Sequence, residues 1–368
     1  MPVRQLPPNP NLDHLKHQAK DLLRDHAART PDTAQRIREF HPRFREATDA
    51  EIFGAKLSLS DAQLTIARQS GFLSWPRLKR HIERPTLTDR LDLPHHERIE
   101  DVVFRRAVDL IDKGDAQGLR AWLKQHPNLV HRHISFPGRN YFENPTLLQF
   151  VAENPIRHGT MPQNIVEITQ AILDAGPTVA EREITLALVA TGSVPQQCRQ
   201  QVPLIDLLCD HGADPDSAME PAALHGTFET LGALIRRGGQ ITLPIAATLG
   251  GIEDVRRLLP SADSRKRQVA LSQAANLGRH EIVRLILDAG ADPDRYNPLG
   301  GHSHGTPLHQ AAGYGHLEVV RLFVERGAKL NQKDVLWQAT PAEWAEHEGR
   351  TEVAAYLRAE ERKRGAAG

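Results

Sequence analysis

Two histidines, His302 and His304, stand one residue apart in the stretch "GGHSHGTPLHQAAGYGHLEVV" of residues 300–320. In an extended segment, residues i and i+2 lie on the same side, so both imidazoles would point one way. Imidazole is a zinc ligand, but a catalytic zinc site usually takes three protein ligands, and His309 is the nearby third candidate. Three interpretations follow: a metal site, hydrogen bonds that order a loop, or contact with a partner or ligand. The pattern favours ordering of the loop.

Other segments also contain acidic or histidine side chains that could bind a metal or act in catalysis, but their positions are typical of turns and connections. The two "ADPD" segments, 213–216 and 291–294, follow a helix-ending glycine, where Asp and Pro are ordinary turn formers. The long connection "HRHISFPGRNYFENP" at 131–145 repeats the His-x-His pattern. The chain contains no nucleophile elbow, HExxH or CxxC motif. We therefore expect no catalytic residue, no cofactor and no bound metal, and we predict that the protein is not an enzyme.

Composition predicts a soluble globular protein of more than one domain. The 368 residues include 46 Lys and Arg against 46 Asp and Glu, which does not favour a dedicated nucleic-acid binder. Two cysteines without disulfide-type spacing fit a reducing compartment, so we expect a cytoplasmic protein. No apolar run approaches the roughly 20 residues that a membrane helix needs, and no partner in a membrane is expected.

The elements that would hold His302 and His304 form a helical hairpin over residues 305–331. Thr306 suits the N-cap of its first helix, and Pro307 suits the first turn. Gly315 and Gly327 can end the two helices. The predicted apolar face is made by Leu308, Ala311, Ala312, Val319, Val320, Leu322, Phe323 and Val324.

The same pattern recurs along the chain. A close copy lies at 270–294, and another lies at 340–360, where the second helix is polar enough to serve as a solvent-facing cap. Weaker copies lie at 166–176, 203–216, 229–239 and 244–259. About eight helical pairs are expected between roughly 104 and 358, several of them irregular.

These repeats resemble ankyrin repeats. The resemblance rests on Thr306-Pro307-Leu308-His309, Ala311-Ala312, Gly315-His316, Glu318-Val319-Val320, Leu322, Gly327-Ala328 and Asn331. It implies an all-α solenoid whose fingers, the connections between repeats, and inner helices recognise another protein. It also implies that His309 orders its loop by hydrogen bonding.

Repeat spacing is uneven around the histidine pair. Gly290 and Gly327 are 37 residues apart, against a family period of about 33, so the finger that contains "RYNPLGGHSH" is longer than usual. Gly250 and Gly278 are only 28 residues apart, so that finger is short. One edge of the solenoid is therefore expected to be specialised.

Residues 1–84 do not follow the repeat and predict a small helical module. Helices are expected over 11–29, 32–40 and, as a pair, 57–84. The segment "DAQLTIARQSGFLSWPRLKRHI" resembles the helical leader of many bacterial ankyrin proteins, which implies no established activity. We expect a linker at 85–99, the solenoid at 100–360 and a disordered tail at 361–368.

The function predicted from this resemblance is a non-catalytic protein–protein interaction scaffold. Its partner is an unidentified protein, and a small molecule is left open as a ligand. The candidate partner-binding residues are Asn276, Leu277, Tyr296, His302, His304, Gly313, Tyr314, Trp337, His347 and Glu348. Exposed aromatic side chains are good anchors in interfaces.

Two alternatives stay open. The first is a small-molecule or metal-dependent enzyme that uses a pocket around His302 and His304. The second is a DNA-associated regulator that acts through the N-terminal helices, since "IARQSGFLSWPRLKRHI" loosely resembles a helix-turn-helix. Its basic patch would be Arg77, Lys79, Arg80 and Arg84.

Overall fold

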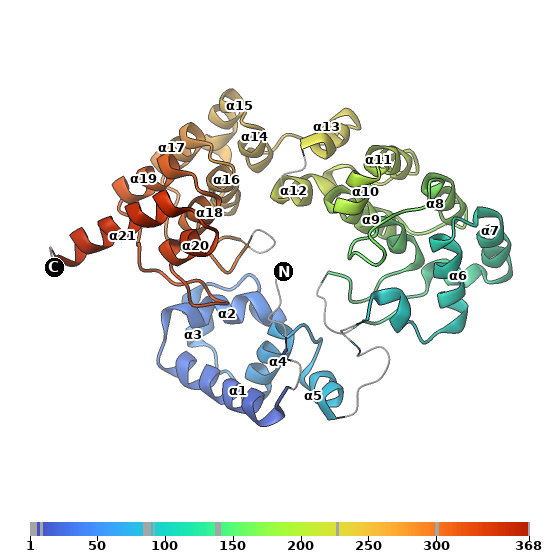
Figure 1. The fold of residues 1–368 in the computed structure, drawn as a ribbon, viewed down its shortest axis with the longest axis horizontal. Coiled ribbons are helices and arrows are strands. Elements are labelled where there is room, and N and C mark those ends of the chain that lie inside the picture. The colour runs from blue at the N-terminus through green and yellow to red at the C-terminus, as the bar shows by residue number, and fades with distance from the viewer. Residues whose placement is uncertain are drawn as a thin grey trace. The chain divides into compact units, whose positions relative to one another are not determined.

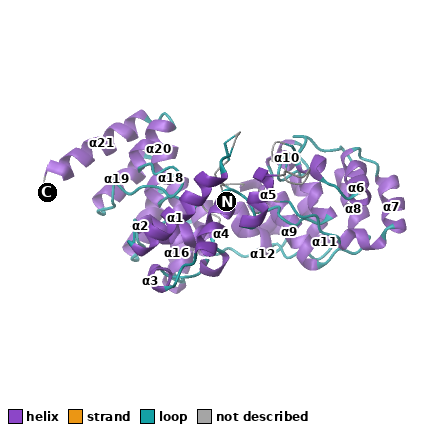
Figure 2. Cartoon of the chain, turned by 90° about the horizontal axis from the view of Figure 1, so that it is seen from below, coloured by secondary structure: helices purple, strands orange, loops and turns teal. Residues whose placement is uncertain are grey.

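The structure is a computed structural model that describes residues 6–7, 10–83, 90, 93–136, 141–225, 228–298 and 302–366. Every regular element within these ranges is a helix, and none is a strand (Figure 2). The prediction of an all-α fold is thus confirmed. No helix in the described part of the chain is long and apolar enough to cross a membrane.

The chain divides into two compact units. One joins Asp13–Ile66 to Ile241–Gly368, and the other holds Ala67–Gln240. The predicted boundaries at 84 and 100 do not coincide with this division. The reason is that the first helices make specific contacts with the C-terminal repeats, so segments far apart in sequence share one unit.

Four helical pairs make up the repeats of the first unit. They are α14 (Leu243–Leu249) with α15 (Ile252–Leu258), α16 (Ser264–Asn276) with α17 (His280–Asp288), α18 (Pro307–Tyr314) with α19 (Leu317–Glu325), and α20 (Pro341–His347) with α21 (Thr351–Ala366). The first helices of successive pairs pack side by side, and so do the second helices (Figure 1). Each pair therefore buries its apolar face against the next.

Small side chains allow the first helices to approach closely. Ala274, Ala275, Ala311 and Ala312 have no exposed surface, and Leu308 is buried beside them in the same hydrophobic core. An alanine pair leaves room for the neighbouring backbone where larger side chains would hold the helices apart. The alanine pairs in the sequence thus mark the stacking surface.

Gly278 stands where two repeats meet. Its φ of +67° lies in the left-handed region, and a Cβ there would lie 2.6 Å from Nδ1 of His316. Nε2 of His316 donates to the carbonyl of Asn276 at 2.8 Å. Glycine therefore permits both the end of α16 and the imidazole bridge from the next repeat.

The C-terminal helix continues further than predicted. Residues 361–368 were expected to be disordered, yet α21 extends to Ala366. The Arg364 guanidinium donates to the carbonyls of Ala328 at 2.7 Å and Val324 at 2.8 Å. These bonds satisfy carbonyls at and just beyond the end of α19 and hold the last turns of α21 in place.

The second unit continues the pairing with less regular elements. Its pairs are α6 (Val102–Asp112) with α7 (Ala116–Gln125), η4 (Leu147–Ala152) with α8 (Ile165–Leu173), α9 (Val179–Thr191) with α11 (Gln201–Asp210), and α12 (Asp216–Leu224) with α13 (Phe228–Arg236). Short elements η3 (Pro127–His131) and α10 (Ser193–Gln197) lie between them. The 3-10 helix η4 takes the place of a first helix and packs on α6, α8 and α9.

Part of the predicted linker at 85–99 is packed structure. Residues 85–89, 91 and 92 lie outside the described ranges, but His95–Arg98 form the 3-10 helix η2. His95 and Arg98 are almost fully buried. The His95 ring lies edge-on to Phe136 and Phe142, at 4.8 and 5.1 Å between centroids. Aromatic contacts therefore fix a segment whose composition indicates a linker.

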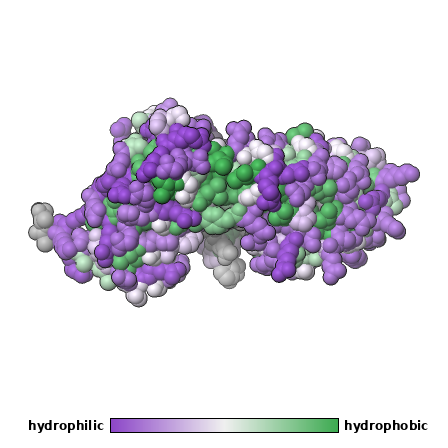
Figure 3. Space-filling view, turned by 90° about the horizontal axis from the view of Figure 1, so that it is seen from above, coloured by the Kyte–Doolittle hydropathy of each residue, from purple (hydrophilic) through white to green (hydrophobic). Residues whose placement is uncertain are grey.

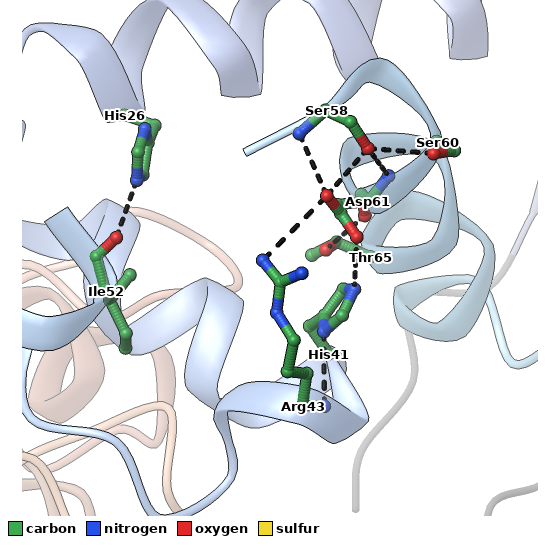
Figure 4. A network of polar contacts seen from close by, with 8 residues as sticks. All are labelled: His26, His41, Arg43, Ile52, Ser58, Ser60, Asp61 and Thr65. Atoms are coloured by element: carbon green, nitrogen blue, oxygen red, sulfur yellow. Dashed lines mark hydrogen bonds and ion pairs between the residues drawn. The ribbon is translucent and has the colours of Figure 1, made fainter. Parts of the chain in front are cut away.

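The front of the first unit contains α1 (Leu12–Ala27), α2 (Pro31–Phe40), η1 (Pro42–Phe44), α3 (Asp49–Gly54) and most of α4 (Leu59–Gln69), while α5 (Trp75–Glu83) belongs to the second unit. Helix α3 was not predicted. Two imidazoles tie these helices together (Figure 4). Nε2 of His26 donates to the Ile52 carbonyl at 2.8 Å, and Nε2 of His41 lies 3.2 Å from a carboxylate oxygen of Asp61.

We expect Leu308→Ala to lower the free energy of unfolding by about 2–5 kcal/mol, because the side chain is buried and its removal leaves a cavity. Urea denaturation followed by circular dichroism measures the loss. The exposed Glu325→Ala is the matched control and should change stability by no more than about 0.5 kcal/mol. Equal stability of the two variants would show that Leu308 does not face the core.

Candidate functional site

The candidate site is built on two neighbouring fingers of the first unit, residues 289–306 and 326–340. The first finger closes on itself, since the amide of Asn297 donates to the Gly305 carbonyl at 2.9 Å and the amide of Gly305 donates to the His302 carbonyl at 3.0 Å. His302 is exposed and has a φ of +56°. The described part of this finger is therefore a folded loop rather than an extended strand of residues.

His304 is buried, which corrects our prediction that it contacts a partner from an exposed finger. Its side chain is 1% exposed, and its ring lies 5.0 Å from that of Trp337 and 5.4 Å from that of Trp344. Its carbonyl accepts from the amide of Val335 at 2.8 Å. Burial and the neighbouring His302 lower the pKa of His304 to about 4, so the ring is neutral at pH 7. His304 joins one finger to the next.

His309 orders the start of α18 by hydrogen bonds, in the way the resemblance implied. Its Nδ1 accepts from the amide of Thr306 at 3.1 Å, and its Nε2 donates to the carbonyl of Ala339 at 3.1 Å. Burial lowers the pKa of His309 to about 4, which keeps it in this neutral form. The residue thus links its own helix to the second finger.

Asp334 organises the second finger, and the sequence analysis missed it. One carboxylate oxygen accepts from the amides of Leu336 at 2.8 Å and Trp337 at 2.7 Å. The other accepts from the amide of Ala339 at 2.9 Å and from Nε1 of Trp344 at 3.0 Å. The only signal in the sequence is an aspartate before a turn, which is common at positions with no such role.

The finger histidines do not form a three-ligand metal site among the described residues. The rings of His302 and His304 are 5.8 Å apart, and both nitrogens of His309 are already used in hydrogen bonds. No third ligand is therefore available from His309 without breaking the loop. Nδ1 of His304 is buried and has no hydrogen-bond partner.

A different group, in the second unit, brings three potential metal ligands together. Ligand atoms of Asp112, Glu153 and His158 lie within 4.8 Å of one another, beside a pocket of about 290 Å³. The Arg157 guanidinium already occupies this cluster, at 2.8 Å from Asp112 and 2.7 Å from Glu153. Two backbone amides and the His158 ring bond to the remaining carboxylate oxygens. The Arg157 guanidinium thus offsets one of the two carboxylate charges, and the contacts of the cluster are explained without a metal.

The predicted partner-binding residues differ widely in exposure. Trp337 and Tyr314 are 64% and 51% exposed, while Gly313 is buried against Trp344. Tyr296 is partly buried and donates to the carbonyl of Lys333 at 2.6 Å, so it also joins the two fingers. Of the other predicted partner-binding residues, His302, His347 and Glu348 are exposed, and Asn276 and Leu277 are partly exposed.

Two of the exposed residues, Trp337 and Tyr314, carry large aromatic side chains. On the one face of the protein that Figure 3 draws, hydrophilic side chains cover most of the area and apolar side chains lie between them. Large aromatic rings with half or more of their area exposed therefore stand out as candidate contact points. Trp337 and Tyr314 meet this description within one unit.

The N-terminal basic patch is less concentrated than predicted. Lys79 and Arg80 are exposed and Arg77 is partly buried, whereas Arg84 lies outside the described residues. The Lys79 ammonium lies 3.8 Å from Glu83 on the same helix, which offsets part of its charge. DNA binding through this helix stays a prediction.

We expect Asp334→Ala to lower the free energy of unfolding by roughly 2–4 kcal/mol, because four donors of the second finger lose their acceptor. Tryptophan fluorescence should shift to the red as Trp337 and Trp344 loosen. Asp292→Ala is the control, since that exposed carboxylate accepts one amide. A native-like spectrum and unchanged urea midpoint for Asp334→Ala would contradict this role.

Comparison with known proteins agrees with the geometry of the repeats. The family model for ankyrin repeats in three copies matches residues 243–334 and 271–364. No curated protein matches the chain. The matched residues are the four stacked helical pairs and both fingers described above, and the chain from 243 to 364 is therefore an array of ankyrin repeats.

Proposed function

We propose that the protein is a non-catalytic scaffold that binds another protein through the fingers and first helices of its C-terminal ankyrin repeats. The observation that carries this proposal is the exposure of Trp337 and Tyr314 on a rigidly packed framework. Ankyrin repeats generally serve as protein–protein interaction modules, which supports the proposal. We further propose that it acts in the cytoplasm and needs no cofactor.

Trp337 is held in place before any partner arrives. Its amide donates to Asp334, and its ring contacts those of His304 and Trp344 at 5.0 and 6.0 Å. A side chain fixed in this way loses little conformational entropy on binding. Tryptophan is also enriched among residues that dominate binding energy.

Tyr314, the last residue of α18, is also held in place by a neighbouring ring. Its ring stacks on His316 at 6.3 Å with an interplanar angle of 12°. His316 is in turn bonded to the Asn276 carbonyl of the preceding repeat. Two exposed aromatic anchors, one on a finger and one at the end of a first helix, are thus carried by the same repeats.

The exposed groups around these anchors set the chemistry of the partner. His347 is the last residue of α20, the helix that follows the second finger, and Glu348 is its C-cap; both are exposed. A partner that fits would offer a hydrophobic pocket for each aromatic ring and polar groups at the rim. We therefore propose a folded protein or structured segment rather than a nucleic acid.

Capture from a lysate followed by direct binding tests this function. A protein retained by the wild type is identified by mass spectrometry, purified and titrated by calorimetry. Trp337→Ala and Tyr314→Ala should each weaken its binding by about tenfold or more, as expected for anchors in an interface. Circular dichroism should show that both variants stay folded.

Phe228→Ala is the matched control, because Phe228 is an aromatic residue of the second unit with 45% exposure. Its affinity for the captured protein should stay within twofold of the wild type. Equal affinity of all four proteins would contradict binding through the fingers. A larger loss in Phe228→Ala would move the binding surface to the second unit.

A further inference from the structure

Helix α2 presents three polar residues along one face to the two fingers. Asp32, Gln35 and Glu39 follow the i, i+3, i+7 spacing of one helical side. Nε2 of Gln338 donates to a carboxylate oxygen of Asp32 at 3.0 Å, and Nε2 of Gln35 donates to the Ser303 carbonyl at 2.8 Å. The N-terminal helices are thus docked on the fingers within the first unit.

Glu39 occupies the end of this face and is buried without an ion-pair partner among the described residues. Its side chain is 3% exposed, and neither carboxylate oxygen has a hydrogen-bond partner of normal geometry. The Ser303 side chain lies close enough to influence it. An ionised carboxylate in such a place has lost its water without gaining compensation, which disfavours the charged form.

Two of the cations near Glu39 in sequence, Arg38 and Arg43, have other partners. Arg38 donates to the Ala47 carbonyl at 2.8 Å and also pairs with Asp49 and Gln35. Arg43 lies 3.9 Å from Asp61 and its guanidinium stands over the ring of Phe44. The titratable groups on α2 and on the segments that contact it include Asp32, Arg36, Arg38, His41, Arg43, Asp49, Glu51, His302, His304, Lys333 and Asp334.

Burial raises the pKa of Glu39 from 4.5 to about 7, although Ser303 opposes the shift. A raised pKa means that the docked state holds the proton more tightly than a released state would. Docking is therefore strongest below pH 4.5, weakens as the pH rises to 7, and changes little above that.

We propose that α2 is a pH-sensitive clasp on the fingers: it closes when the Glu39 carboxyl is protonated and loosens when that carboxyl ionises. The helix can leave the fingers without unfolding, because its own module holds it independently. His41 with Asp61, at the N-terminus of α4, and Arg38 with Asp49, on α3, supply those internal contacts (Figure 4 shows the first). The fingers likewise keep their Asp334 and His309 bonds.

Loosening would uncover the Ser303 and Gln338 side of the fingers, next to Trp337. Competition between α2 and a partner for this surface is a consequence that rests on the proposed function. The clasp itself does not depend on it, since docking is measured on the isolated chain. Failure of one proposal therefore leaves the other standing.

Pulsed electron spin resonance on the full chain tests the clasp. Spin labels are placed at Lys20→Cys on α1 and Glu325→Cys on α19, both exposed positions in the first unit, with Cys198 and Cys209 changed to serine. The distance distribution should be single at pH 5.5 and gain a second, longer component at pH 8. The docking constant should fall by roughly 25-fold between these values, from the shift of Glu39 from 4.5 to about 7.

Two variants separate the proton effect from simple loss of contact. Glu39→Gln, an uncharged isostere, should show the same distribution at both pH values. Gln35→Ala should increase the longer component at both, yet keep the pH dependence. If the wild-type docking is too stable for the released state to be detected, Gln35→Ala weakens it, so that the released fraction can be measured.

A distribution that does not depend on pH in either the wild type or Gln35→Ala would overturn the proposal. An equal pH response in Glu39→Gln would assign the effect to another group and overturn it as well. Nuclear magnetic resonance of protein with carbon-labelled glutamate is the second readout. The carboxyl resonance that is missing in Glu39→Gln belongs to Glu39, and it should titrate near pH 7. Titration near 4.5 would overturn the proposal too.

Discussion

The repeats depend on one constraint: a single pair of short helices cannot bury its apolar face alone, so each pair needs the next. The first helices meet through alanine pairs with no exposed surface, and this close approach brings successive fingers side by side. Once adjacent, the fingers can share side chains. His304, Tyr296 and His309 all bond to or pack against the following finger, so the fingers are connected parts of the framework rather than loose loops.

This connection changes the meaning of the His302–His304 pair. The two imidazoles differ in role although they are one residue apart, because one is exposed and the other is enclosed by two tryptophans. The enclosed ring is neutral at physiological pH, and it packs edge-on against the ring of Trp337. Trp337 is consequently both a wall of a small aromatic cluster and the most exposed aromatic side chain of its unit among the described residues. A rigid anchor of this kind suits recognition by a preformed surface.

The N-terminal helices add a second layer to the same fingers. Their contact includes an amide–carbonyl bond, an amide–carboxylate bond and one buried carboxylate whose oxygens have no hydrogen-bond partner of normal geometry. Because a buried, unpaired carboxylate is costly to ionise, the protonation state of this one group can alter the stability of the contact appreciably. When Glu39 is ionised, its buried and unpaired carboxylate destabilises the contact between α2 and the fingers. A contact with only a structural role would not need such a residue.

The sequence by itself determined the repeats: the Thr-Pro-Leu-His start, the alanine pairs and the closing glycines are short-range signals, each with a local physical cause. Exposed Trp337 and Tyr314 were also foreseeable, since they occupy a finger and a helix end. Only the tertiary structure decided the burial of His304, the four bonds of Asp334, the ordered α21 and the membership of residues 13–66 in the C-terminal unit. Each of these depends on contacts with a neighbouring repeat or a distant segment, such as Gln35 with Ser303. Hydrophobic periodicity records which side of a helix is buried, but it does not record which distant surface covers a polar residue.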